Sequence, residues 1–363
     1  MDQFVVGIDW NTTYSQVSYW RPGSPEPESL SVGKGEEQYE IPAGSLEELL
    51  KKTMRLLRPV ERLGMAAAVV FSVKQADTQT VEQVKAAAMQ AGIQEERIYV
   101  QTDEESFCAY VMHQSRDIYS HQVALFSYEE NCLKACMLVL NQRRLPCLVR
   151  VEEQEEWQIP DMGDLTREEQ DAYFASLILR MFDQRVVSTA YLLGNGFEER
   201  WYENSLKVLC AGRRVFAGNN LFAKGACYRA AELSGEEPPV SYLYFGNDKI
   251  PCNVGICVMN GQRDGVEVLI PAGVNWYEAK AECEVILYDK PVVEILFQPL
   301  QGTSMLKESI LLDGLPERPS RATRLRVEVT FTKKTSCQVR IWDLGFGELF
   351  PATNLSWEEE VDV

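Results

Sequence analysis

Residues 5–13 read Val-Val-Gly-Ile-Asp-Trp-Asn-Thr-Thr, and this stretch decides the fold. An apolar run ends at one carboxylate, Asp9, and a turn of small polar residues separates it from a second run over residues 14–20. This order predicts a strand, a tight turn and a second strand. The N–H groups of such a turn can cradle a phosphate, but a lone aspartate there can also support the turn by accepting N–H bonds.

The composition of the chain bounds its function. It has 363 residues, of which 45% are hydrophobic and 25% charged, as expected for a globular protein of one large or two smaller domains. Its formal net charge is −18. Nucleic-acid backbones and anionic membrane surfaces are therefore repelled overall, and we expect neither nucleic acid nor membrane as a partner.

The cysteines and the N-terminus indicate the compartment. Ten cysteines are scattered without the paired Cys-x-x-Cys spacing that places four thiolates around zinc, so we interpret them as reduced and mostly buried. Asp2 stands where a signal peptide carries positive charge, and no apolar run approaches the membrane-spanning length of about 20 residues. The expected location is cytoplasmic.

The opening pattern occurs twice. A second pair of apolar runs, 122–126 and 133–140, is joined by the turn Ser127-Tyr128-Glu129-Glu130-Asn131-Cys132. Each pair is followed by helical periodicity with a capping signature, Ser45 with Glu48 and Thr166 with Glu169. The sequence therefore predicts two related α/β halves.

The last third of the chain reads differently. A linker is predicted at 236–248, because glutamates and prolines interrupt the helical pattern there. Beyond it, runs such as 325–331 alternate apolar and polar residues with period two, which predicts an all-β sandwich over 249–363. The apolar segment 242–245 is either the first strand of the sandwich, which we favour, or a linker that docks on the preceding domain.

These features together resemble the seventy-kilodalton heat-shock chaperones, the DnaK-like family. The family motif Gly-Ile-Asp-Leu-Gly-Thr-Thr is similar to residues 7–13, where Asn11 replaces a glycine and is the least unfavourable replacement at positive φ. The segment around Lys224-Gly225-Ala226 is similar to the adenosine side of the family site, and Leu269-Ile270-Pro271-Ala272-Gly273 to its sandwich. The resemblance implies an actin-like ATPase core with ribonuclease-H-like halves over 1–235, then a peptide-binding-type sandwich.

The resemblance also implies a site. It would bind ATP or ADP with Mg²⁺, with Asp9 as the candidate for the metal and for catalysis. The residues expected to contact the nucleotide are Asp9, Asn11, Thr12, Thr13, Gly194 and Gly196. For the two glycines, an alternative is a turn that needs unusual φ.

Departures from the family pattern reduce the expected chemistry. The second family turn, Asp-Leu-Gly-Gly-Gly-Thr, aligns with residues 127–132, so Ser127 replaces the metal-side aspartate and Glu129 and Glu130 replace glycines. Each glutamate would repel a phosphate by about 4 kcal/mol at 4 Å and an effective dielectric of about 20. The family's water-orienting glutamate aligns with Thr102, and an arginine of its adenosine-side motif with Glu198.

We therefore expect a chaperone-like protein- or peptide-binding protein with little or no ATP hydrolysis. The partners that the resemblance implies are a protein or peptide client and other chaperone components. One alternative is a slow ATPase or nucleotide sensor that uses Asp9 with Asp103 or Glu130, and another is a filament-forming actin relative.

Overall fold

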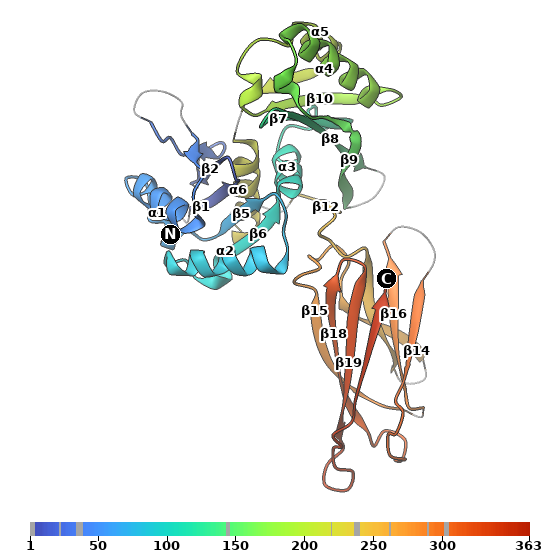
Figure 1. The fold of residues 1–363 in the computed structure, drawn as a ribbon. Coiled ribbons are helices and arrows are strands. Elements are labelled where there is room, and N and C mark those ends of the chain that lie inside the picture. Colours follow the sequence, from blue (N-terminus) through green and yellow to red (C-terminus); the bar gives the residue numbers. More distant parts are fainter. Residues whose placement is uncertain are drawn as a thin grey trace. The chain divides into compact units, whose positions relative to one another are not determined.

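The computed structural model describes residues 4–21, 23–33, 39–142, 146–218, 220–235, 240–260, 263–288, 290–300 and 305–363. Residues 236–239 of the predicted linker lie outside them. The chain divides into two compact units, Met1–Gly246 and Asn247–Val363, which Figure 1 shows as ribbons. The division falls inside the predicted linker, 236–248.

The first half of unit 1 is built on one mixed sheet with the strand order β3-β2-β1-β5-β6. Its strands are β1 (Val5–Trp10), β2 (Tyr14–Trp20), β3 (Glu28–Ser29), β4 (Ile41–Pro42), β5 (Val69–Val73) and β6 (Ile98–Thr102). Strands β1 and β2 pair antiparallel, whereas β1, β5 and β6 are parallel, and β4 pairs with β2. Its helices are α1 (Leu46–Leu57), α2 (Thr78–Gln90) and α3 (Asp103–Met112).

The second half repeats this order, because its strands β9-β8-β7-β10-β11 correspond in turn to β3-β2-β1-β5-β6 of the first half. Its elements are β7 (Gln122–Glu129), β8 (Cys132–Asn141), β9 (Cys147–Ile159), α4 (Arg167–Phe182), β10 (Val187–Leu193), α5 (Glu203–Leu209), β11 (Arg214–Ala217) and α6 (Leu221–Ser234). Short 3₁₀ turns are η1 (Leu63–Met65), η2 (Glu95–Arg97), η3 (Met162–Asp164) and η4 (Asn195–Phe197). An antiparallel hairpin pair extended by two parallel strands, present twice, is the actin-like arrangement of ribonuclease-H-like halves, so the predicted fold class is confirmed.

Helix α6 follows the second half in sequence but packs on the sheet of the first. A Cβ at Gly7 would lie 2.2 Å from the carbonyl oxygen of Ala223, and one at Gly225 would lie 1.9 Å from that of Ser106 in α3. These glycines are required because backbone meets backbone here. Val5, Ala226 and Ala230 belong to the buried cluster between α6 and the sheet.

Helix starts follow the predicted capping residues. Ser45 accepts a hydrogen bond from the Glu48 N–H at the start of α1. At α4 the capping box is complete, since Thr166 accepts from the Glu169 N–H and the Glu169 carboxylate accepts from the Thr166 N–H. These caps satisfy N–H groups that have no partner within the helix.

Strand β12 (Tyr242–Tyr244) corrects one expectation. It pairs in parallel with β9 at the edge of the second sheet of unit 1 and is not a strand of the sandwich. The Tyr244 hydroxyl also donates to Glu104 at the start of α3, 2.8 Å away. A three-residue apolar strand carries too little pattern to identify its sheet, so our preferred interpretation of 242–245 was wrong.

Unit 2 is a sandwich of two four-stranded antiparallel sheets, with the orders β14-β13-β16-β17 and β15-β18-β19-β20. Its strands are β13 (Cys252–Asn260), β14 (Arg263–Ile270), β15 (Lys280–Ile286), β16 (Val292–Pro299), β17 (Leu306–Leu311), β18 (Arg324–Lys333), β19 (Ser336–Gly345) and β20 (Ser356–Asp362). The alternation in 325–331 puts Leu325, Val327 and Val329 in the core between the sheets. The predicted sandwich is confirmed.

All ten cysteines are free thiols, and five of them are buried. In the part of the chain that the structure describes, no helix has the length and apolar character to cross a membrane.

Candidate functional site

Asp9 lies near the C-terminal end of β1, where it is paired with Gln16 of β2 on one side and with Ser72 of β5 on the other. Only 3% of its surface is exposed, and its Oδ1 has no hydrogen-bond partner among the residues that the structure describes. Burial raises the pKa of the Asp9 carboxyl well above its usual range, and the nearby carboxylates of Asp103 and Glu129 raise it further. Asp9 is therefore in place at the strand end, but in surroundings that favour its neutral form.

Asp103 is the second carboxylate of this cluster and begins α3, directly after β6. The Ser72 hydroxyl donates to Asp103 Oδ1 at 2.7 Å, and Ser72 Oγ also lies 2.6 Å from Ser106 Oγ. Burial raises the pKa of Asp103 to about 6 with help from Glu129, although the Ser72 hydrogen bond and Lys74 act in the opposite direction. The carboxyl ends of the parallel strands β1, β5 and β6 thus gather Asp9, Ser72 and Asp103 at one sheet edge.

The first turn, residues 11–13, satisfies its own polar groups. The Asn11 side-chain oxygen accepts from the Thr12 N–H at 2.7 Å and from the Thr12 hydroxyl at 3.3 Å. Asn11 does not adopt positive φ, so our reason for an asparagine there was wrong. An asparagine that bonds to the following N–H groups is an ordinary turn former. Thr102, where the family has a glutamate, caps α3 by accepting from the Glu105 N–H.

The second turn is tighter than the sequence suggested. Strand β7 continues through Glu129, which pairs with Cys132, so only Glu130 and Asn131 form the turn. Their φ values are 49° and 62°, and a two-residue turn with both residues at positive φ is the type I′ geometry of closed hairpins. Ser127, Tyr128 and Glu129 are therefore strand residues.

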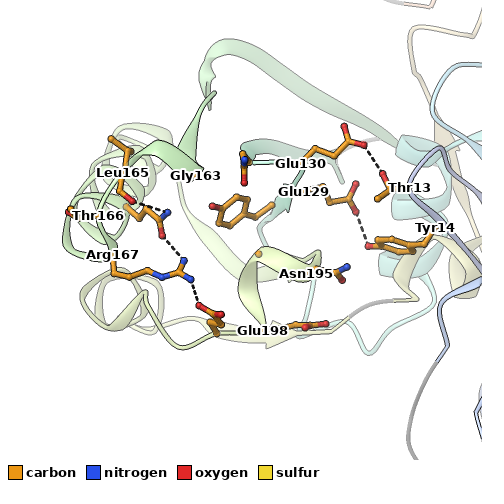
Figure 2. A pocket seen from close by; sticks show the side chains of 15 residues that line it. Thr13, Tyr14, Glu129, Glu130, Gly163, Leu165, Thr166, Arg167, Asn195 and Glu198 are labelled. Atoms are coloured by element: carbon orange, nitrogen blue, oxygen red, sulfur yellow. Dashed lines mark hydrogen bonds and ion pairs between the residues drawn. The ribbon is translucent and has the colours of Figure 1, made fainter. Parts of the chain in front are cut away.

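The two hairpins are hydrogen-bonded to each other. The Tyr14 hydroxyl donates to Glu129 Oε1 at 2.9 Å, and the Thr13 hydroxyl donates to Glu130 Oε1 at 3.0 Å (Figure 2). Burial and the Glu129 carboxylate raise the pKa of Tyr14, so its hydroxyl remains a donor at neutral pH. We call this pair of hydrogen bonds the cross-cleft contact, because it joins the first half of unit 1 to the second.

Gly194 and Gly196 lie against Tyr128. Gly194 has φ of 95°, and a Cβ there would lie 2.4 Å from the Tyr128 carbonyl oxygen. A Cβ at Gly196 would lie 2.2 Å from the Tyr128 ring, which in turn packs edge-on against Trp201 with centroids 5.6 Å apart. Their lack of a side chain is thus explained by packing within the protein.

A cavity of about 690 Å³ adjoins the cross-cleft contact. It is bordered by Thr13 and Tyr14 of the first half and by the second turn, the start of α4 and η4 of the second half. Four of its described lining residues are acidic: Glu129, Glu130, Glu198 and Glu199. Arg167 is the single basic side chain among those described, and it pairs with Glu199. Figure 2 shows Glu129 and Glu130 directed toward Tyr14 and Thr13.

A metal centre is not preassembled in this region. Across the described residues, no group of three or more histidine, cysteine, aspartate or glutamate side chains has the geometry to hold a metal ion. Asp9 is our candidate metal ligand. The nearby carboxylates of Asp103 and Glu129 act on it through their charge, which raises its pKa. Sequence reasoning missed Tyr14 and Arg167, because neither belongs to a motif. Each contacts a glutamate that is distant in the sequence, Glu129 for Tyr14 and Glu199 for Arg167.

Residues 43–247 match a family described as "Family of unknown function (DUF5716) C-terminal", and residues 249–363 match a "Domain of unknown function (DUF8552)". No curated protein matches the chain.

Two solved structures match part of this chain. One is the inorganic polyphosphate/ATP-glucomannokinase from Arthrobacter sp. strain KM, at 10% identity and a TM-score of 0.43, covering 65% of this chain and 100% of that one. The other is a protein of Bacteroides thetaiotaomicron VPI-5482 with an actin-like ATPase fold and unknown function. It has 12% identity and a TM-score of 0.35, covering 62% of this chain and 96% of that one.

Proposed function

We propose that this chain, which belongs to the family of unknown function DUF5716, is a chaperone-like protein- or peptide-binding protein that hydrolyses little or no ATP. The observation that carries the proposal is the cross-cleft contact, in which Tyr14 and Thr13 bond to Glu129 and Glu130. In an actin-like ATPase, the two hairpin turns face each other across bound phosphates. Here each turn presents its polar groups to the other.

Phosphate groups fit this cleft poorly. A phosphate between the turns would have to break both hydrogen bonds of the cross-cleft contact and lie next to Glu129 and Glu130. Each carboxylate at about 4 Å repels a phosphate charge by about 4 kcal/mol at an effective dielectric of about 20. Micromolar affinity corresponds to about 8 kcal/mol in all, so the two glutamates oppose most of it.

Mg²⁺ fits no better. Magnesium in nucleotide sites is held by ionised carboxylates together with phosphate oxygens. Asp9 is buried, and burial together with the Asp103 and Glu129 carboxylates raises its pKa, which opposes the ionised form that a magnesium ligand needs. Asp9, Glu129 and Glu130 therefore disfavour the binding of ATP or ADP with Mg²⁺ as a resident cofactor.

Partner binding is supported by the sandwich and by the resemblance to DnaK-like chaperones. In the described part of the chain, strands β14 and β17 are the two edge strands of one of its sheets. An extended peptide can add to such an edge and gain main-chain hydrogen bonds. The exposed Met305, which precedes β17, and Leu306, its first residue, would give such a peptide apolar contacts.

Suppression of aggregation tests this proposal directly. A chemically denatured model protein is diluted into buffer with the purified full chain, and light scattering is followed with and without millimolar Mg-ATP. We expect reduced scattering that is the same in both conditions. Unchanged scattering would refute the chaperone-like role, and an effect that depends on Mg-ATP would refute the ATP-independent mechanism.

A slow ATPase or nucleotide sensor is the second candidate. It is favoured by the cavity of about 690 Å³, since ligand sites commonly have about 300–1,000 Å³. It is also favoured by the buried Oδ1 of Asp9, which has no hydrogen-bond partner among the described residues. Phosphate release from millimolar ATP that is lost in Asp9→Asn would support this candidate. Release equal in wild type and variant would eliminate it.

A further inference from the structure

His113 is a largely buried histidine at the C-terminal end of α3. Its side chain is 9% exposed, and its Nδ1 lies 2.7 Å from the carbonyl oxygen of Ala109, one helical turn earlier. Because a carbonyl oxygen can only accept, Nδ1 carries a proton and donates this hydrogen bond. The charge of the ring therefore depends on whether its second nitrogen, Nε2, also carries a proton.

The Nε2 atom of His113 faces the carboxylate of Glu232 on α6. It lies 3.4 Å from Glu232 Oε1, and the Glu232 side chain is 2% exposed. Glu232 also accepts hydrogen bonds from Arg229 at 2.6 Å and from the Val240 N–H at 3.2 Å. These two donors favour the ionised carboxylate. An unprotonated Nε2 would place its lone pair against a negative oxygen, whereas a protonated Nε2 forms an ion pair.

Two further features favour a positive charge on the His113 ring. The ring stacks on that of Tyr228, with the centroids 4.6 Å and the planes 14° apart, and the face of a tyrosine ring attracts a cation. The C-terminal end of a helix also stabilises a cation in its last turn. Burial acts in the opposite direction, because it disfavours the charged form of a histidine. The ion pair with Glu232, the Tyr228 ring and the end of α3 together oppose this cost.

The charges around His113 are balanced only when the ring is protonated. The other titratable side chains on the described elements that pack around it are Glu105 and Cys108 of α3, Tyr228, Arg229 and Glu232 of α6, and Tyr242 of β12. Burial raises the pKa of Cys108 and of Tyr242 well above the usual range, and that of Tyr228 to about 12, so these three are neutral at neutral pH. Two carboxylates then share one guanidinium, and a proton on His113 supplies the second positive charge.

Glu232 is the point at which three segments meet. It contacts the end of α3 through His113, its own helix through Arg229, and the segment that enters β12 through the Val240 N–H. We propose that His113 is an imidazolium and that its proton is a pH-sensitive latch, which holds residues 240–244 against α3 and α6. Histidine ordinarily changes its charge between about pH 5 and 8. As the pH rises, loss of the proton turns the attraction between His113 and Glu232 into repulsion and loosens this segment.

Nitrogen NMR of the full chain tests the charge of His113 directly. The chain has two histidines, so ¹⁵N labelling of histidine gives signals from His113 and His121 alone, and His121→Gln assigns them. We expect both ring nitrogens of His113 to carry protons at about pH 6, and Nε2 to lose its proton reversibly as the pH is raised to about 9. A His113 ring whose charge is the same throughout this range, neutral or positive, would overturn the proposal.

Hydrogen exchange tests what the latch holds. Protection factors, which remove the intrinsic effect of pH on exchange, are compared at about pH 6 and about pH 8.5, with the amides of 325–331 in unit 2 as the internal reference. In wild type and in the control His121→Gln, whose exposed histidine lies outside the latch, we expect at least a tenfold loss of protection in 240–244 at the higher pH.

Two variants separate the latch from a contact that is insensitive to pH. Glu232→Gln should keep the protection of 240–244 nearly constant, because its amide can donate to a neutral Nε2. His113→Gln has no titrating ring and should show low protection at both pH values. Equal protection of 240–244 in wild type at the two pH values, or a wild-type loss of protection in His113→Gln, would contradict the latch.

Discussion

Tyr14 of the first hairpin donates a hydrogen bond to Glu129 of the second, 115 positions away in the sequence, with the oxygens 2.9 Å apart. The bond joins the two halves of an actin-like core at the place where the two turns face each other. Thr13 and Glu130 make a second bond beside it. The two hairpins that the sequence predicted to face each other are thus hydrogen-bonded to each other through their side chains.

Removal of the Tyr14 hydroxyl should loosen the cross-cleft contact. Tyr14→Phe keeps the ring and leaves Glu129 without its donor, so we expect the free energy of unfolding to fall by about 1–2 kcal/mol in urea denaturation. Hydrogen exchange of residues 122–132 should also become faster. The matched control is Tyr19→Phe, because Tyr19 bonds to Glu28 within the first half, and it should leave exchange in 122–132 unchanged.

The carboxylate cluster predicts a dependence of stability on pH. The pKa of Asp103 is raised to about 6 from an ordinary value of 3.8, so the folded state holds its proton more tightly than the unfolded state does. Its contribution is fully present below about pH 4 and is lost as the pH rises through 6. Asp103→Asn should therefore be more stable than wild type by about 1–3 kcal/mol at pH 8, with a smaller difference at pH 4.

Asp77→Asn is the control of opposite sign. The Thr80 N–H at the start of α2 holds the pKa of Asp77 below its usual range, so Asp77 contributes stability above its ordinary pKa. This variant should lose stability at pH 8 relative to pH 4. If Asp103→Asn and Asp77→Asn shift the pH profile in the same direction, the described burial of Asp103 is incorrect.

The packing of Gly196 on Tyr128 can be tested by a double-mutant cycle. Gly196→Ala puts a Cβ 2.2 Å from the Tyr128 ring, so we expect a loss of about 1–3 kcal/mol in unfolding free energy. In the Tyr128→Ala background the same change should cost less, since the clash is gone. Gly218→Ala, where no atom lies within 4 Å, is the control and should be close to neutral.

Arg318 and Asp343 form a buried ion pair in the sandwich. Both Arg318 Nη atoms lie 2.8 Å from the carboxylate oxygens of Asp343, and the two side chains are 5% and 0% exposed. Although burial alone would raise the pKa of Asp343, these hydrogen bonds lower it below its usual range. Arg318→Lys cannot form the paired contact and should reduce stability by about 1–3 kcal/mol. Arg340→Lys, at an exposed pair with Glu358, should change it by less than about 0.5 kcal/mol.

The sequence predicted the parts that local pattern controls. The apolar run ending at Asp9, its repeat before Ser127 and the capping box at Thr166 each depend on a few neighbouring residues, and all appear as expected. The alternation in 325–331 likewise identified a sandwich strand. The strand order within each half was predicted from the resemblance to DnaK-like chaperones, which implies an actin-like core.

The candidate site was less predictable because its contacts are long-range. Nothing near Tyr14 in the sequence indicates Glu129 as its partner, and nothing near Gly196 indicates the Tyr128 ring. The type I′ turn at Glu130 and Asn131 was also missed, since glutamate is a poor residue for positive φ and hides a turn that glycine would reveal. The short strand β12 had too few residues to show which sheet it joins.

Calorimetric titration of the full chain with Mg-ATP tests the central claim most directly, that the cross-cleft contact replaces a bound nucleotide. We expect no binding heat up to millimolar Mg-ATP, for wild type and for Asp9→Ala alike. Micromolar binding by wild type that disappears in Asp9→Ala would contradict it, because Asp9 would then hold a nucleotide complex in a cleft that this account describes as closed.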